Sequence, residues 1–183
     1  EEELAAAKEA LGTKVQGFVP AEFEAGPVVD AAAGSLNDDQ QRAMHVSKAA
    51  CDALGLIDPA ATLFGNYAVA EGALIGVVTS DKPDEIRLSA LVTLGKIGSA
   101  AATDALVATF TGTANATSVR AQAAMALGGI YKGMAAPEAA YQALLGGFGD
   151  EAPAIRKACG LALGGLDLTG AQRTEVVTKW RVE

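Results

Sequence analysis

The sequence predicts an all-α fold of about five helix pairs, and three observations predict it. A helical frame of 13 residues recurs along the chain. Its copies lie 33 to 40 residues apart, which is the length of repeats built from two helices. Half of the residues are hydrophobic but only 5% are aromatic, so Ala, Leu, Val and Gly supply most of the apolar content. Small residues suit closely packed helices better than a β-sandwich.

The frame is clearest in residues 85–97, EIRLSALVTLGKI. Residues 118–130 and 154–166 match it without gaps, and 45–57 matches with Ser47 in place of the arginine. The shared residues include an arginine near the start and a glycine near the end. They are Arg87, Arg120 and Arg156, and Gly55, Gly95, Gly128 and Gly164. The apolar positions of the frame fall on two sides of a helix, which predicts burial between neighbours.

Each copy is predicted to be the first helix of a pair, followed by a turn and a second helix. The first pair is the weakest: residues 3–15 keep the frame without its arginine, and 21–36 are the partner. The later pairs are 45–57 with 65–78, 85–97 with 101–110, 118–130 with 137–148, and 154–166 with 170–180. We expect one domain over 1–183, with approximate repeats 1–37, 38–83, 84–116, 117–152 and 153–183. The alternative that the chain is a fragment of a longer protein is left open.

The pattern xVRxxAAxALGxIG, followed by an Ala-rich helix, resembles HEAT repeats. It is most similar to the short HEAT-like subtype first described in phycobilisome lyases, well over 84–166 and fairly over 45–80. The resemblance implies an armadillo-like α-α superhelix, a solenoid whose second helices line a concave surface that holds another protein. It also implies that the repeated arginines tie neighbouring repeats together. On their residue types alone, the arginines also suit a ladder for an acidic partner, whereas their structural partners would be Asp84, Glu85, Asp150 and Glu151.

The repeated glycine predicts close helix packing. A glycine inside a helix costs about 1 kcal/mol relative to alanine. Because four copies accept this cost at one place, we expect another helix to pass there too closely for a Cβ atom. Gly98, just after the clearest copy, is predicted to be a left-handed C-terminal cap.

Composition and motifs argue against several function classes. The net charge of −8 disfavours nucleic acid and anionic membrane surfaces, and no apolar run reaches the ~20 residues of a membrane span. Cys51 and Cys159 are predicted to be free buried thiols, with a disulfide left open. His45 is the single histidine, so it cannot build a His-rich metal site, and no nucleophile elbow or phosphate loop occurs. We therefore predict no catalytic residues, no metal, no cofactor and no enzyme activity.

The predicted function is a non-catalytic scaffold that presents a concave helical surface to a peptide or protein. The candidate contacts are polar-capable side chains on the second helices: Tyr67, Glu71, Asp104, Thr109, Glu138, Tyr141 and Gln142. Tyr67 and Tyr141 fit packing between repeats equally well, and Trp180 is predicted to cap the last repeat. Two alternatives stay open. The resemblance alone suggests a lyase- or chaperone-like subunit acting on a tetrapyrrole-bearing protein, and a DNA-lesion enzyme on a similar scaffold is disfavoured by the charge. Compartment and oligomeric state are not fixed by the sequence.

Overall fold

The computed structural model describes residues 40–56 and 67–182 of the chain, with side chains over 46–56 and 68–181. This part is all-helical, with eight α-helices and no strand, as the sequence predicts. Two 3-10 turns, Ala100–Ala102 and Gly147–Gly149, precede α6 and follow α8. The helices are α3 Gln40–Leu54, α4 Tyr67–Val78, α5 Asp84–Ile97, α6 Thr103–Thr111, α7 Thr117–Ile130, α8 Glu138–Gly146, α9 Pro153–Gly165 and α10 Gly170–Val182. The helices expected at 3–15 and 21–36 lie outside the described residues.

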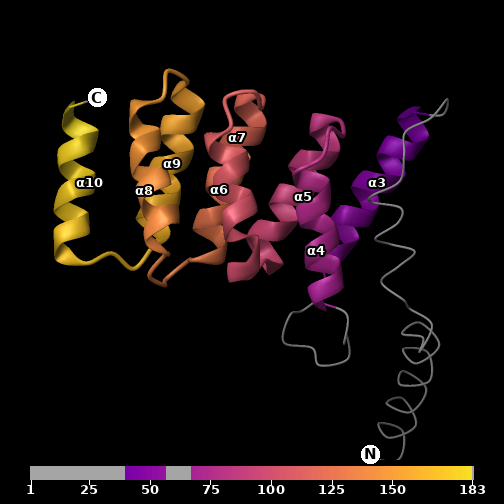
Figure 1. Cartoon of the computed structure of the whole chain (residues 1–183), viewed down its shortest axis with the longest axis horizontal. Coiled ribbons are helices and arrows are strands. Elements are labelled where there is room, and N and C mark those ends of the chain that lie inside the picture. Colours follow the sequence, from indigo (N-terminus) through magenta and orange to yellow (C-terminus); the bar gives the residue numbers. More distant parts are fainter. Residues whose placement is uncertain (1–39, 57–66, 183) are drawn as a thin grey trace, which may run out of the picture.

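The helices stand side by side in two rows (Figure 1). The first row is α3, α5, α7 and α9, and the second row is α4, α6, α8 and α10. From α5 on, each first-row helix lies against both members of the preceding pair: α5 against α3 and α4, α7 against α5 and α6, and α9 against α7 and α8. A first-row helix therefore fills the groove left by the pair before it.

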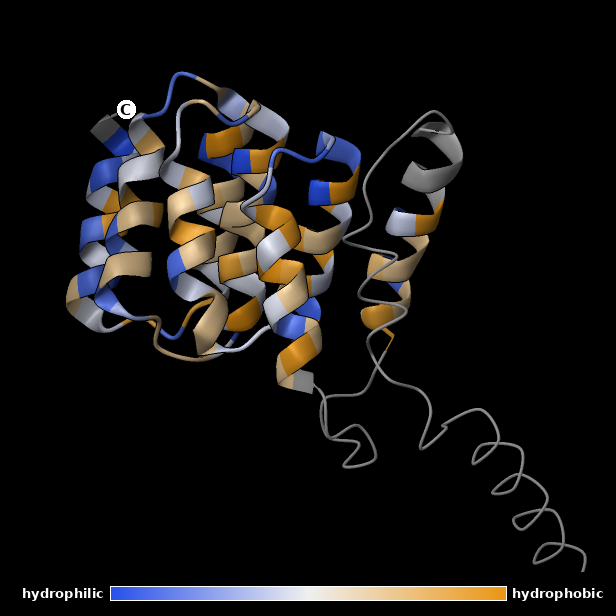
Figure 2. Ribbon diagram, turned by 45° about the vertical axis from the view of Figure 1, so that its right-hand side comes forward, coloured by the Kyte–Doolittle hydropathy of each residue, from blue (hydrophilic) through white to orange (hydrophobic). Residues whose placement is uncertain are grey.

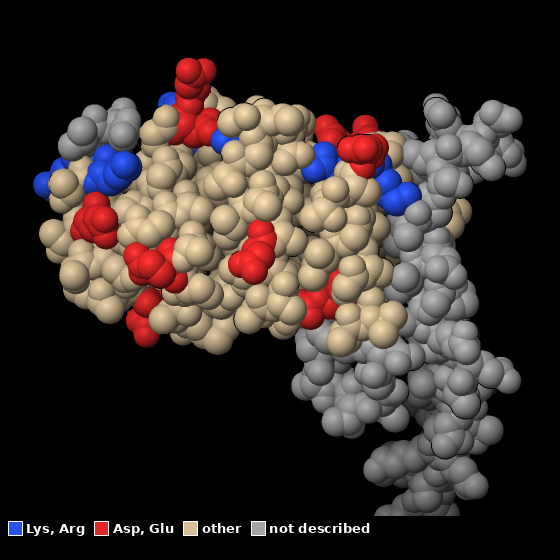
Figure 3. Space-filling view, viewed as in Figure 1, with Lys and Arg blue, Asp and Glu red and all other residues tan. Residues whose placement is uncertain are grey.

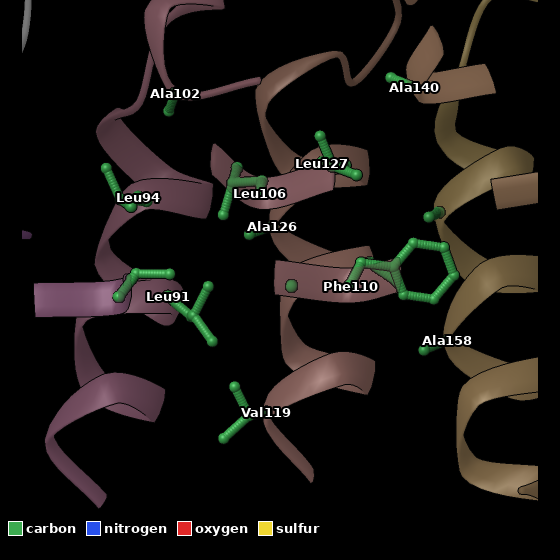
Figure 4. Close-up of a cluster of buried hydrophobic side chains, with 14 of the residues drawn as sticks. Leu91, Leu94, Ala102, Leu106, Phe110, Val119, Ala126, Leu127, Ala140 and Ala158 are labelled. Atoms are coloured by element: carbon green, nitrogen blue, oxygen red, sulfur yellow. The ribbon is translucent and has the colours of Figure 1, made fainter. Parts of the chain in front are cut away.

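The apolar positions of the frame form a continuous core between the rows. Ile86, Val119 and Ile155 occupy the same frame position in α5, α7 and α9, and all three are fully buried. Figure 4 shows Leu91 of α5 beside Val119 of α7, while the Phe110 ring points toward the helix that carries Ala158. Hydrophilic residues gather in loops and along α10 (Figure 2). Burial of each such aliphatic side chain stabilises the fold by about 1.5–3 kcal/mol.

The repeated glycines mark where neighbouring first-row helices cross. A Cβ atom built on Gly95 would lie 3.0 Å from the Ala126 Cα, and one built on Gly128 would lie 2.6 Å from the Ala162 Cα. One built on Gly55 would lie 3.1 Å from the Thr93 hydroxyl. The close approach that the sequence predicts is thus confirmed at Gly95 and Gly128, where the nearest atom belongs to the backbone of the next helix. At Gly55, by contrast, the nearest atom of the next helix belongs to the Thr93 side chain.

At each of these crossings, the glycine lies against the residue that is two positions before the repeated glycine of the next helix. These residues are Thr93, Ala126 and Ala162. We call this pairing the stacking register. Gly164 of α9 is the exception: among the described residues, nothing lies within 4 Å of a Cβ built on it. The fourth glycine is open because no first-row helix follows α9 in the described part of the chain.

The left-handed cap predicted at Gly98 is wrong. Gly98 has φ −64° and ψ 153°, an extended conformation, and its N–H donates to the Leu94 carbonyl oxygen at 2.7 Å. The chain leaves α5 straight into the 3-10 turn, where the Ala101 N–H donates to the Ser99 hydroxyl at 3.2 Å. Gly98 is still needed, because a Cβ there would collide with the Leu94 carbonyl oxygen and lie 3.0 Å from the Ile130 side chain.

Candidate functional site

Three of the predicted partner-contacting side chains are buried and bonded within the protein, which corrects the expectation that they face a partner. Glu71 accepts hydrogen bonds from the Ser99 N–H at 2.6 Å and the Ser99 hydroxyl at 3.0 Å, joining α4 to the loop after α5. The Thr109 hydroxyl donates to the Ala105 carbonyl oxygen at 2.7 Å. Tyr141 is also buried. The sequence shows that these residues are polar, but their polar atoms form hydrogen bonds within the protein.

Tyr141 joins two helix pairs. Its hydroxyl donates to the Glu175 carboxylate at 2.8 Å and lies 3.4 Å from the Gln172 carbonyl oxygen, so it links α8 to α10. Burial, helped by the hydrogen bond and the charge of Glu175, raises the pKa of Tyr141 well above its usual range. Of the two roles left open by the sequence, Tyr141 has the packing role.

Asp104, Glu138 and Gln142 are exposed on α6 and α8. The Gln142 amide donates to the Glu138 carboxylate at 2.9 Å. Asp104 and Glu138 lie in the first turns of their helices, where a carboxylate also favours the helix dipole. Tyr67 opens α4, and its side chain lies outside the described residues.

Helices α4, α6 and α8 form a surface that carries one sign of charge, and we call it the second-row surface. Helix α10, which contains Arg173, Lys179 and Arg181, is not part of it. No Lys or Arg occurs in the sequences of α4, α6 and α8. In the face seen in Figure 3, the lower half of the described part shows acidic groups on an uncharged background, and the basic groups lie in the upper half. The arrangement leaves an acidic, mostly small-residue surface.

Arg87 and Arg120 each bridge the end of one second-row helix and the loop that leads into the next first-row helix. The Nε donates to a backbone carbonyl, and the Nη2 donates to a side-chain oxygen of that loop. The acceptors are Val78 O and Asn115 Oδ1 for Arg87, and Phe110 O and Asp150 Oδ2 for Arg120, at 2.5–3.0 Å. Arg87 also lies 3.4 Å from Asp84. These contacts support the interpretation in which the arginines tie successive pairs together.

Asp150 is the most heavily used carboxylate of these loops. Its burial disfavours the charged form, but the Ala152 N–H and the Arg120 guanidinium outweigh that effect, so the pKa of Asp150 lies below its usual value. Arg156 differs from the other two arginines, since its Nη1 donates to the backbone carbonyls of Asp150 and Glu151 at 2.8 and 2.9 Å.

The two cysteines are free thiols in the core. Cys51 and Cys159 are fully buried. Burial raises the pKa of Cys51 to about 11 and that of Cys159 to about 12, so both are held in the protonated form, which is a poor nucleophile. The described residues contain no cluster of His, Cys, Asp and Glu suited to a metal ion. They also contain no helix long and apolar enough to cross a membrane. The His45 side chain lies outside the described residues.

A groove between α9 and α10 was not foreseen from the sequence. It has a volume of about 460 Å³ and is lined by Phe148, Arg156, Lys157, Gly160, Leu161 and Trp180. The Phe148 and Trp180 rings contact each other, with centroids 5.9 Å apart and planes at 50°. One signal was present in the sequence: Gly160 stands where α5 has Leu91 and α7 has Ala124, so the last copy of the frame lacks a side chain there.

Comparison with known proteins does not assign the chain to a family. No protein-family model matches the chain, and no curated protein matches it. The function is therefore argued from the geometry of these surfaces.

Proposed function

We propose that this protein is a non-catalytic scaffold, a HEAT-like superhelix of about five helix pairs that binds a basic peptide or protein on its second-row surface. The observation that carries the proposal is the uniform sign of that surface. Asp104 and Glu138 are exposed on adjacent helices, and α4, α6 and α8 contain no cation.

The chemistry of this surface suits a bound chain. Complementary charge steers association and rejects wrongly charged partners, while each exposed ion pair contributes only about 0–1 kcal/mol. The affinity therefore has to come from contact area. Ala108, Ala139 and Gly72 are exposed on these helices, and such small side chains let a partner's backbone approach closely.

The buried thiols support a role without covalent chemistry. A cysteine nucleophile needs an accessible thiolate, whereas Cys51 and Cys159 are enclosed and have raised pKa values. For the alternative subunit acting on a tetrapyrrole-bearing protein, we expect no shifted absorbance band when a bilin is added to the chain.

Charge reversal on the second row tests the proposal. We expect the Glu138→Lys chain to capture several-fold less partner than the wild-type chain, because an attraction for a basic partner becomes a repulsion. Quantitative mass spectrometry of affinity-captured proteins measures this loss. Glu85→Lys is the matched control, since Glu85 is also an exposed first-turn carboxylate but belongs to first-row helix α5.

The control separates a loss of partner binding from the loss of stability that follows when a carboxylate is removed from the first turn of a helix. Both changes remove a carboxylate from a helix N-terminus, so both should lower the stability by about 0.3–1 kcal/mol. If the Glu138→Lys and Glu85→Lys chains retain the same proteins in the same amounts, the second-row surface is not the binding surface.

A further inference from the structure

The groove between α9 and α10 occupies a distinctive place in the stack. From α5 on, each first-row helix fills the groove between the two helices of the preceding pair. The groove of the α9–α10 pair is the next in this series, and in the described part of the chain no helix fills it. The residues of α5 and α7 that contact the next first-row helix have counterparts in α9 that contact no such helix in the described part of the chain.

The aromatic residues at the ends of the second-row helices show the difference most directly. Phe110 near the end of α6 is 2% exposed, and Phe148 in the turn after α8 is 4% exposed. Trp180, near the end of α10, is 66% exposed. Leu161 of α9, which also lines the groove, is 56% exposed. Trp180 thus borders an open groove, whereas the aromatic side chains at the corresponding places along the stack are covered. Leu161 stands where α5 has Val92 and α7 has Met125, and each of these is also exposed, at 38%.

The stacking register stops at the same place. Gly95 receives Ala126 and Gly128 receives Ala162, but Gly164 receives no described residue. Arg120 crosses to the loop before α9 and bonds Asp150, whereas Arg156 lines the groove and donates only its Nη1, to backbone carbonyls. The α9 face therefore leaves open the glycine and the arginine whose counterparts in α7 contact α9 and the loop before it.

The charge of the groove selects the partner. Lys157 stands where α5 has Leu88 and α7 has Ala121, so this groove carries a cation that the filled ones do not. Lys179 and Arg181 lie in the last turn of α10, next to Trp180. A helix that enters here needs carboxylates toward its N-terminal end, opposite Arg156 and Lys157.

From these features we propose that the α9–α10 groove binds an amphipathic α-helix of a partner protein. That helix packs in the stacking register, with a small residue against Gly164, apolar side chains over Leu161 and Trp180, and a carboxylate on Arg156. The surface is separate from the acidic second-row surface and binds a partner of opposite charge.

Trp180 is the only tryptophan of the chain and reports on the groove directly. The probe is a synthetic peptide of residues 149–166 with Cys159→Ala, because this segment fills the corresponding groove between α7 and α8. A Leu161→Glu change in the peptide allows a lactam bridge between the Lys157 amine and the new carboxyl group, which keeps the peptide helical on the side turned away from its contact face. With the full 183-residue chain, we expect a saturable blue shift of the Trp180 emission.

Matched changes on both sides test the register. A peptide with Ala162→Leu, and a chain with Gly164→Leu, should each bind at least tenfold more weakly. Leu161→Asp, at an exposed site, gives a second chain variant, and circular dichroism checks that both variants fold. Chains with Asp104→Lys or Glu138→Lys should bind the peptide as the wild type does, so failure of the second-row proposal is distinguishable from failure of this one.

Three outcomes would overturn the proposal. The first is the absence of a saturable shift, and the second is equal binding of the Ala162→Leu peptide. The third is formation of dimers by the chain alone, with the same Trp180 shift, which would assign the groove to a second copy. Light scattering at the concentrations of the titration detects that third outcome.

Discussion

Replacing Gly128 by alanine is expected to lower the free energy of unfolding by about 1–3 kcal/mol, the usual cost of forcing extra atoms into a packed interior. The new Cβ would lie 2.6 Å from the Ala162 Cα and 2.7 Å from the Ala162 Cβ. Real Cβ atoms do not approach other atoms so closely, so α7 and α9 must move apart. That separation loosens the core between them.

Gly164→Ala is the matched control. Gly164 has the same frame position, lies in α9, and has no described atom within 4 Å of its Cβ site. The substitution should therefore raise stability, by up to about 1 kcal/mol, because alanine has the higher helix propensity. Urea denaturation followed by circular dichroism measures both variants. Equal stabilities would show that the repeated glycine is unrelated to helix crossing.

The second large effect is expected at Tyr141. Tyr141→Ala should cost about 3–5 kcal/mol, as removal of a buried aromatic side chain does. Tyr141→Phe keeps the ring and loses only the hydroxyl, with its hydrogen bond to Glu175 and its long contact with the Gln172 carbonyl oxygen, a change of about 0.5–1.5 kcal/mol. Thermal denaturation separates the two, since 1 kcal/mol corresponds to about 2–4 °C for a chain of this size.

Trp180→Ala is the control for Tyr141. Trp180 is a larger aromatic side chain, but it is mostly exposed, so its removal should change the stability by less than about 1 kcal/mol. If Tyr141→Ala lowers the free energy of unfolding no more than Trp180→Ala does, then Tyr141 is not part of the core. The prediction that it contacts a partner would then stand.

The helices were predictable because their signal is local and repeated. The first helices expected at 85–97, 118–130 and 154–166 correspond to α5, α7 and α9, with boundaries shifted by one residue at most. A frame that recurs in register fixes both the helix and the face that it buries.

Of the four predicted arginine partners, Asp84 and Asp150 accept through their carboxylates and Glu151 accepts through its backbone carbonyl. No such contact involves Glu85 in the described part of the chain, and the acceptors Val78 O, Phe110 O and Asn115 Oδ1 were not predicted.

The candidate binding residues were less predictable, because residue type does not reveal the partner of a polar group. Glu71 and Tyr141 look like surface residues in the sequence, yet both are buried and their polar atoms bond Ser99 and Glu175 of neighbouring segments. The groove at Trp180 was missed for the opposite reason. Trp180 was expected to be a cap, and only its exposure beside Phe148 shows an open surface.

The central claim is that first-row helices pack in one stacking register, and a disulfide tests it most directly. The Cβ site of Gly95 lies 3.5 Å from the Cβ atom of Ala126, at the lower edge of the ~3.5–4.5 Å range of native disulfides. Mild oxidation of a chain carrying Gly95→Cys and Ala126→Cys should form this bond within one molecule, as detected by peptide mass spectrometry. A chain with Gly164→Cys and Ala126→Cys should form none. Failure of the first pair to close, or closure of the second, would contradict the register.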